Sequence, residues 1–136
     1  MNARMMAPVL LAGLVCMVGC ESDADAALRR ESLLNEKRIE MLRRGNDSLT
    51  QPREVVFWAR FKRQTDLPCF DGWLSQHGYT VQYTSERKKD DYPQVVEFTR
   101  SLVPTLDTMN ATSVELMAAA AACEGVFQEW EAPVVP

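Results

Sequence analysis

The chain has 136 residues, nearly half of them apolar and a quarter charged, which is typical of a globular protein. Acidic residues outnumber basic ones by nineteen to fifteen. This balance argues against a nucleic-acid-binding protein, which needs a concentrated basic face to neutralise phosphates. His77 is the only histidine, so the cysteines have no histidine partners for a zinc site, and no cofactor fingerprint is present. We therefore expect no metal and no cofactor.

The first twenty residues have the organisation of a bacterial export signal. Arg4 supplies a positive charge, an apolar run follows over residues 5–18, and the run ends in Gly19-Cys20. This run has about the length of a signal-peptide core and is too short to span a bilayer as a helix. A small residue followed by cysteine resembles the lipobox of bacterial lipoproteins, whose cysteine becomes the mature N-terminus and carries the lipid chains. We expect residues 1–19 to be a lipoprotein signal peptide and Cys20 to be lipidated; an ordinary signal peptide cleaved near Gly19 is the alternative.

The residue after the expected lipidation site bears on location. Glu21 stands where many Gram-negative lipoproteins that stay in the inner membrane have Asp. We therefore expect a lipid-anchored protein of the outer membrane that faces the periplasm.

Residues 20–51 form a charged segment between the leader and the rest of the chain. Six acidic and six basic residues cancel across residues 21–46, and a helix is predicted over residues 24–44, ended by Gly45. The pattern predicts a solvent-exposed helix that serves as a stalk. Alternatively, its basic stripe lies against acidic lipid headgroups beside the anchor. Heptad spacing relates Ala27, Leu34 and Met41, and likewise Arg30, Lys37 and Arg44.

Residues 52–136 are expected to form one domain. β-Branched and aromatic residues predict strands at 54–61, 79–85, 94–103 and 126–131. Helix-forming residues with start and stop signals predict helices at 66–77 and 107–123. The order βαββαβ indicates an α+β fold: a ferredoxin-like sandwich with an antiparallel sheet and two helices on one face.

Three stretches of this domain carry a resemblance to a known family. They are residues 76–81 (Gln-His-Gly-Tyr-Thr-Val), the apolar positions of residues 116–121, and residues 125–131 (Gly-Val-Phe-Gln-Glu-Trp-Glu). Together they resemble the regulator of ribonuclease activity B family, often described as ribonuclease E inhibitors. The last stretch departs from the family's Gly-x-Tyr-Asp-Gly-Trp-Glu pattern at Phe127, Gln128 and Glu129. The resemblance implies a protein that binds a nuclease in the cytosol and restrains it.

A lipobox and a cytosolic nuclease partner are incompatible in one molecule, because the inner membrane would separate them. We favour reuse of the family fold in the envelope, since the leader has its charge, apolar run and cleavage site in the right order. The alternative is a cytosolic ribonuclease E inhibitor synthesised from an internal start such as Met41.

Two cysteines remain beyond the leader. Cys69 lies near the start of the first predicted domain helix and Cys123 at the end of the second. In a βαββαβ sandwich these helix ends lie at the same edge, so a disulfide between them is geometrically reasonable in an oxidising compartment. Two separate buried thiols are the alternative.

The sheet face away from the helices is the natural binding surface. Strand alternation predicts two sets of residues. Facing the helices are Phe57, Phe61, Val81, Tyr83, Val96 and Phe98, whereas Trp58, Arg60, Gln82, Glu97, Phe127 and Glu129 lie on the open face.

We expect Trp58, Arg60 and Phe127 to contact a protein partner, with Trp58 and Phe127 forming one aromatic patch. Alternatively, Trp58 packs under the C-terminal tail. No nucleophile with an assignable base is visible, so we expect a non-enzymatic protein-binding module, with a partner that the sequence does not identify.

Overall fold

The structure is a computed structural model that describes Gly19 and residues 21–136. Its elements are, in order, α1 (Asp23–Arg44), β1 (Arg53–Phe61), a short 3-10 helix (Gln64–Asp66), α2 (Leu67–Gln76), β2 (Thr80–Glu86), β3 (Gln94–Leu102), α3 (Leu106–Ala122) and β4 (Gly125–Glu131). The expected lipidation site at Cys20 and residues 1–18 of the expected signal peptide lie outside the described residues. None of the described helices combines the length and the apolar character needed to cross a membrane.

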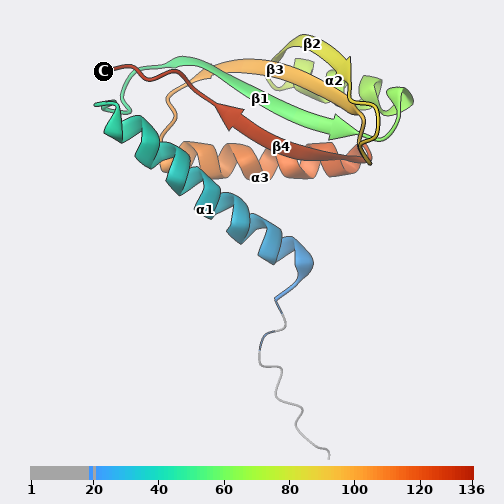
Figure 1. Ribbon diagram of the computed structural model, residues 1–136, viewed down its shortest axis with the longest axis horizontal. Coiled ribbons are helices and arrows are strands. Elements are labelled where there is room, and N and C mark those ends of the chain that lie inside the picture. Colours follow the sequence, from blue (N-terminus) through green and yellow to red (C-terminus); the bar gives the residue numbers. More distant parts are fainter. Residues whose placement is uncertain (1–18, 20) are drawn as a thin grey trace, which may run out of the picture.

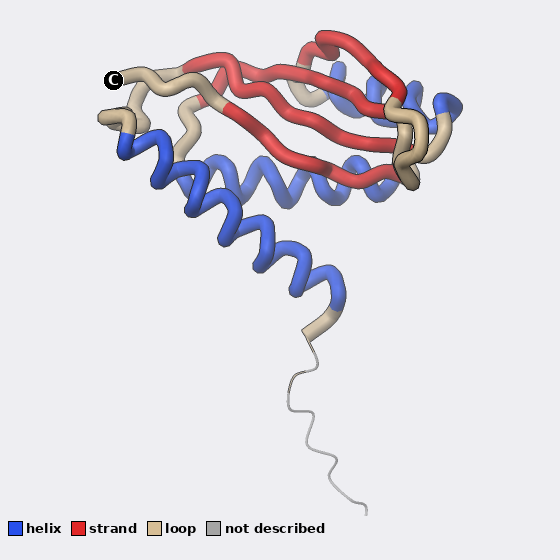
Figure 2. Tube along the Cα trace, viewed as in Figure 1, coloured by secondary structure: helices blue, strands red, loops and turns tan. Residues whose placement is uncertain are grey.

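The four strands form one antiparallel sheet in the spatial order β2-β3-β1-β4 (Figure 2). Strand β1 is central because β3 and β4 pair with its two sides, and β2 extends the sheet beyond β3. This order, with α2 and α3 connecting the strands, is the ferredoxin-like arrangement. The predicted α+β, ferredoxin-like βαββαβ fold is confirmed, and each predicted element agrees with its observed bounds to within one residue.

Helices α2 and α3 pack on one face of the sheet, and α1 lies beside α3 (Figure 1). Phe57, Phe61 and Phe98 point toward these helices and are fully buried. Phe70 of α2 packs among them, with ring centroids 4.9 Å from Phe61 and 5.4 Å from Phe98. The rest of the core on this face includes Val55, Ala59, Leu74, Val96, Met109, Leu116 and Ala120. None of the described helices covers the opposite face.

Local sequence explains where the two domain helices begin and end. The Oγ1 of Thr105 accepts a hydrogen bond from the backbone N–H of Thr108 at 3.2 Å and so caps α3. Pro68 lies in the first turn of α2, where backbone N–H groups have no acceptor within the helix, so its lack of an N–H costs no helical hydrogen bond. Gly78 has a φ of 78°, which lets the chain turn sharply out of α2 into β2.

A disulfide joins the two domain helices. The Cα atoms of Cys69 in α2 and Cys123 after α3 are 5.7 Å apart, and their sulfur atoms are bonded. The bridge closes a loop with a sequence separation of 54 residues. It therefore ties the start of one helix to the end of the other at a single edge of the domain.

Helix α1 is docked on the domain over its C-terminal half. The prediction that this helix is solvent-exposed is wrong there, because Ile39 and Leu42 are buried in the hydrophobic core. Leu34 and Met41, which are related by heptad spacing, are both exposed, at 43% and 68%. The buried positions recur instead at intervals of three and four residues on another side of the helix. Only the N-terminal part of α1 projects beyond the sheet (Figure 1).

A buried polar seam joins α1 to α3 and β4. Asn35 is fully buried, and its Oδ1 accepts a hydrogen bond from the Trp130 Nε1–H at 2.7 Å. Its Nδ2 donates to Asn110 Oδ1 at 3.0 Å and to Ser113 Oγ at 3.1 Å. The Arg38 guanidinium lies over the Trp130 ring, 5.6 Å from its centroid. These bonds satisfy polar groups that would otherwise be costly to bury, so they fix how α1 docks.

A buried ion pair holds the C-terminal tail on the helix side of the sheet. Arg53 Nη2 donates to Asp47 Oδ1 at 3.0 Å, a second bond joins Arg53 Nη1 to Asp47 Oδ2, and Nη1 also donates to the Pro133 carbonyl at 3.0 Å. The Val135 N–H donates to Asp47 Oδ2 at 2.9 Å. The hydrogen bonds from Arg53 hold the pKa of Asp47 far below its usual range, against the opposing effect of burial. The tail is therefore fixed near the end of α1.

Candidate functional site: the open face of the sheet

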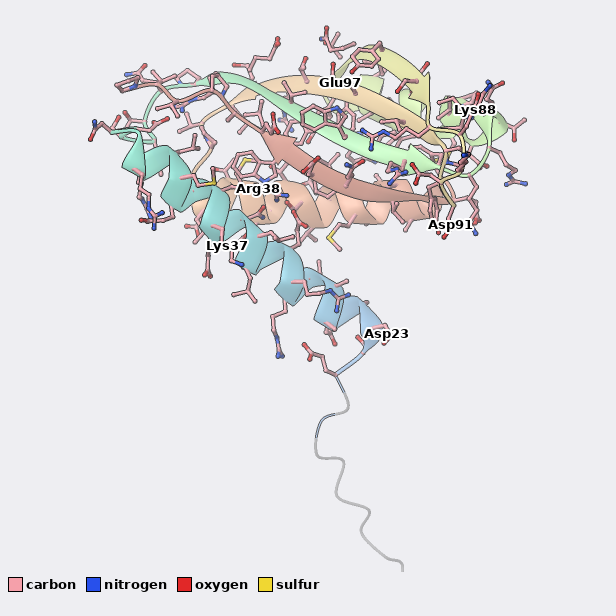
Figure 3. The ribbon with its side chains drawn as sticks, in the orientation of Figure 1. Asp23, Lys37, Arg38, Lys88, Asp91 and Glu97 are labelled. Carbon is pink, nitrogen blue, oxygen red and sulfur yellow. A yellow bond between two sulfur atoms is a disulfide. The ribbon has the colours of Figure 1, made fainter. Side chains whose placement is uncertain are left out.

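One row of side chains crosses all four strands on the face that the helices leave open. Strand pairing sets Tyr83 opposite Glu97, Glu97 opposite Trp58, and Trp58 opposite Glu129. Residues directly opposite each other on paired strands project from the same face. The row therefore reads aromatic, acidic, aromatic, acidic from β2 to β4. Glu97 lies on the side of the sheet away from α1 and α3 (Figure 3).

Tyr83 belongs to this row because β2 contains a bulge. The register against β3 shifts between Val81 and Tyr83, so that Val81 pairs with Phe98 and Tyr83 with Glu97. One extra residue turns the following side chains to the other face. The prediction that Tyr83 faces the helices is therefore wrong, and its side chain is 54% exposed on the open face. No local sequence signal marks this bulge.

A second bulge turns Phe127 away from the open face and toward the helices. The register of β1 against β4 shifts between Trp58 and Ala59, so that Phe127 pairs with the fully buried Ala59. Phe127 consequently packs against the hydrophobic core. The predictions that it lies on the open face and forms an aromatic patch with Trp58 are wrong. The other aromatic side chain in the row of Trp58 is Tyr83, which lies on β2 with strand β3 between them.

Trp58 lies on the open face as predicted and is partly exposed. The C-terminal tail does not lie over it, because that tail is bound to Asp47 and Arg53 and approaches Gly45 at the end of α1. The pairing partners of Trp58 are Glu97 and Glu129, which are themselves only partly buried. The indole is therefore available to a partner.

Arg60 also lies on the open face, but its guanidinium is already engaged. Nε donates to the Tyr92 carbonyl at 3.2 Å, and Nη2 forms an ion pair with Asp90. Both acceptors belong to the turn between β2 and β3. Arg60 therefore holds that turn against β1, a role that the sequence did not reveal.

The open face is acidic around its aromatic row. Glu131 pairs with Val56 one row from Trp58, and Glu54 pairs with Ser101 one row further along β1. Neither glutamate forms a hydrogen bond or ion pair with any other described side chain, and the same holds for Glu97. Glu129 accepts one hydrogen bond, from Gln128 Nε2 at 3.2 Å. Four carboxylates therefore share one face with Arg60, whose charge is already paired.

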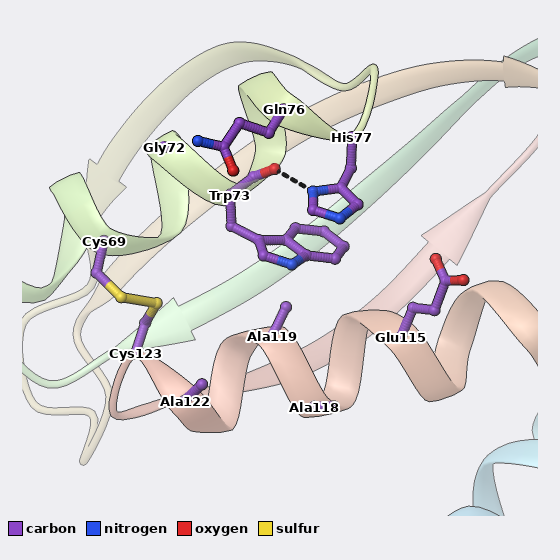
Figure 4. A pocket seen from close by; sticks show the side chains of 10 residues that line it. All are labelled: Cys69, Gly72, Trp73, Gln76, His77, Glu115, Ala118, Ala119, Ala122 and Cys123. Carbon is purple, nitrogen blue, oxygen red and sulfur yellow. Dashed lines mark hydrogen bonds between the residues drawn. A yellow bond between two sulfur atoms is a disulfide. The ribbon is translucent and has the colours of Figure 1, made fainter.

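A groove of about 750 Å³ lies between α2 and α3 on the helix side (Figure 4). The Trp73 and His77 rings stack along it with centroids 4.0 Å apart, and His77 Nδ1 donates to the Trp73 carbonyl at 2.7 Å. Ala119 and Glu115 line the opposite helix. Within the described part of the chain no three histidine, cysteine, aspartate or glutamate residues cluster as a metal site would require. The groove presents apolar and aromatic surface beside the disulfide.

Comparison with known proteins identifies the family. No curated protein matches the chain significantly. The family model described as regulator of ribonuclease activity B matches residues 34–132, which include the second half of α1 and the whole sheet. Members of this family are regulators rather than enzymes. With nearly three quarters of its length matched, the chain belongs to the regulator of ribonuclease activity B family.

Proposed function

We propose that this protein is a lipid-anchored component of the bacterial envelope that binds a protein partner through the open face of its sheet and catalyses no reaction. The observation that carries the proposal is an uncovered sheet face on which Trp58 and Tyr83 are accessible beside unpaired carboxylates. Aromatic side chains are enriched where proteins bind one another. A regulatory family is consistent with binding rather than catalysis.

The disulfide supports placement in the envelope. Disulfides persist in the periplasm and on cell surfaces, whereas cytosolic thiols are kept reduced. The bond between Cys69 and Cys123 therefore fits a domain that is exported and held by lipid on Cys20. In this proposal the anchor lies in the outer membrane and the domain faces the periplasm.

The alternative proposal is a cytosolic regulator of ribonuclease activity, which the family description favours. An internal start at Met41 fits the structure poorly. It would remove Asn35 and Ile39, and Trp130 would lose the acceptor of its buried N–H. The family match also begins at residue 34, before that methionine. Any cytosolic form would therefore need to retain most of α1.

Site-specific photo-crosslinking in intact cells tests the binding surface. A photoreactive phenylalanine analogue replaces Tyr83 in one strain and the similarly exposed Val114 of α3, 48% accessible, in another. We expect a discrete crosslinked protein adduct from position 83 and none from position 114. Adducts from position 114 alone would place the partner on the helix side and refute the proposal.

A further inference from the structure

Two β-bulges border the aromatic row of the open face. Both register shifts of the sheet border the same row, one just before Tyr83 in β2 and one just after Trp58 in β1. Bulges re-aim side chains and are over-represented beside functional sites. The bulge in β2 sets Tyr83 opposite Glu97 on the open face of the sheet. Glu97 therefore has Tyr83 on one side, on β2, and Trp58 on the other, on β1.

Glu97 thus lies between two aromatic side chains. Neighbouring strands are about 4.8 Å apart, so the bases of Tyr83 and Trp58 are separated by roughly 10 Å with Glu97 midway. A cation bound to the carboxylate of Glu97 would lie between these two aromatic side chains, and cation–π attraction acts over about 6 Å from a ring centroid. Among the described residues Glu97 forms no ion pair. Arg60 is paired with Asp90 instead, and the Lys62 ammonium lies over the Tyr92 ring, 5.2 Å from its centroid.

We propose, on the basis of the function proposed above, that the open face binds an arginine-rich segment of the partner protein, with one guanidinium held at Glu97 between Trp58 and Tyr83. A guanidinium is planar, stacks on aromatic rings and forms paired hydrogen bonds with a carboxylate. An ammonium group on lysine offers the charge without the stacking plane. The arrangement therefore selects arginine over lysine.

Other carboxylates of the open face could pair with further basic residues of the bound segment. Glu129 lies beyond Trp58 in the same row, Glu131 lies one row away, and Glu54 lies two rows away. Two strand spacings, about 10 Å, separate Glu97 from Glu129. Further basic residues of the partner would pair with these carboxylates. The same charges repel nucleic acid, which the aromatic pair alone would otherwise suit.

Fluorescence anisotropy with a labelled hexa-arginine peptide tests the inference on the full lipidated chain in a non-ionic detergent. Glu97→Gln keeps the shape of the side chain and removes its charge. Glu115→Gln is the matched control, because Glu115 is an exposed carboxylate of α3 on the helix side. We expect Glu97→Gln to raise the Kd about tenfold, the effect of losing one charge-assisted contact, and Glu115→Gln to change it by less than about twofold. Hexa-lysine should bind more weakly than hexa-arginine.

Two results would overturn the inference. Equal weakening by the two glutamine variants would show attraction to net charge alone, and equal affinity for the two peptides would show that no stacking occurs. Either result leaves the crosslink at position 83 as independent support for a binding surface with another kind of partner. A missing crosslink would refute the proposed function whatever the peptide does.

Discussion

Asn35→Ala tests whether α1 is part of the folded domain. The substitution removes the acceptor of the buried Trp130 Nε1–H and the donor to Asn110 and Ser113, at 2.7, 3.0 and 3.1 Å. An unsatisfied buried N–H costs about 1–3 kcal/mol, and each lost hydrogen bond contributes about 1 kcal/mol. We therefore expect the free energy of unfolding to fall by about 3 kcal/mol, measured by urea denaturation followed by circular dichroism.

The control for this variant lies one residue further along the same helix. Glu36 is exposed, so Glu36→Ala should change stability by no more than about 0.5 kcal/mol. Similar small losses for both variants would mean that α1 is an undocked stalk. That result would refute the packing of α1 against α3 and β4.

Two further predictions concern covalent and ionic bonds of the domain. Replacing both cysteines of the disulfide by serine should lower the free energy of unfolding by about 4 kcal/mol, from the lost constraint on the unfolded chain; a urea midpoint unaffected by reducing agent would contradict this. Asp47→Asn should cost about 3–5 kcal/mol near neutral pH, because it leaves Arg53 buried without its counter-charge. The pKa of Asp47 is depressed in the folded state, so its contribution is present above its unfolded pKa of about 4 and is lost as pH falls below it. Urea denaturation should therefore show wild type and Asp47→Asn converging as pH falls through about 3 and below, and a constant difference would contradict that account.

The strands and helices were predictable because local signals agree with the fold. The apolar and β-branched run of β1, the alanines of α3 and Gly78 after α2 each favour one local structure. The proximity of Cys69 and Cys123 was also predictable from the topology, because the fold brings the start of α2 and the end of α3 to one edge of the domain.

The faces of individual side chains were harder to predict. A bulge depends on how two strands pair, so Tyr83 and Phe127 exchanged their predicted faces without any signal in their own neighbourhood. The docking of α1 was hidden because its buried side includes Glu31 and Asn35, which look like surface residues in sequence. Their partners lie about 80 or more residues away in α3 and β4. Only the tertiary structure supplies the hydrogen bonds that make such burial favourable.

Mass spectrometry of the native N-terminus, on fractionated cells, distinguishes an envelope-anchored binding protein from a cytosolic one. For an anchored envelope protein we expect a chain that begins at diacyl- or triacyl-modified Cys20 and is recovered with the outer membrane. An unmodified chain with an internal N-terminus in the soluble cytoplasm would contradict it and favour direct regulation of a cytosolic ribonuclease.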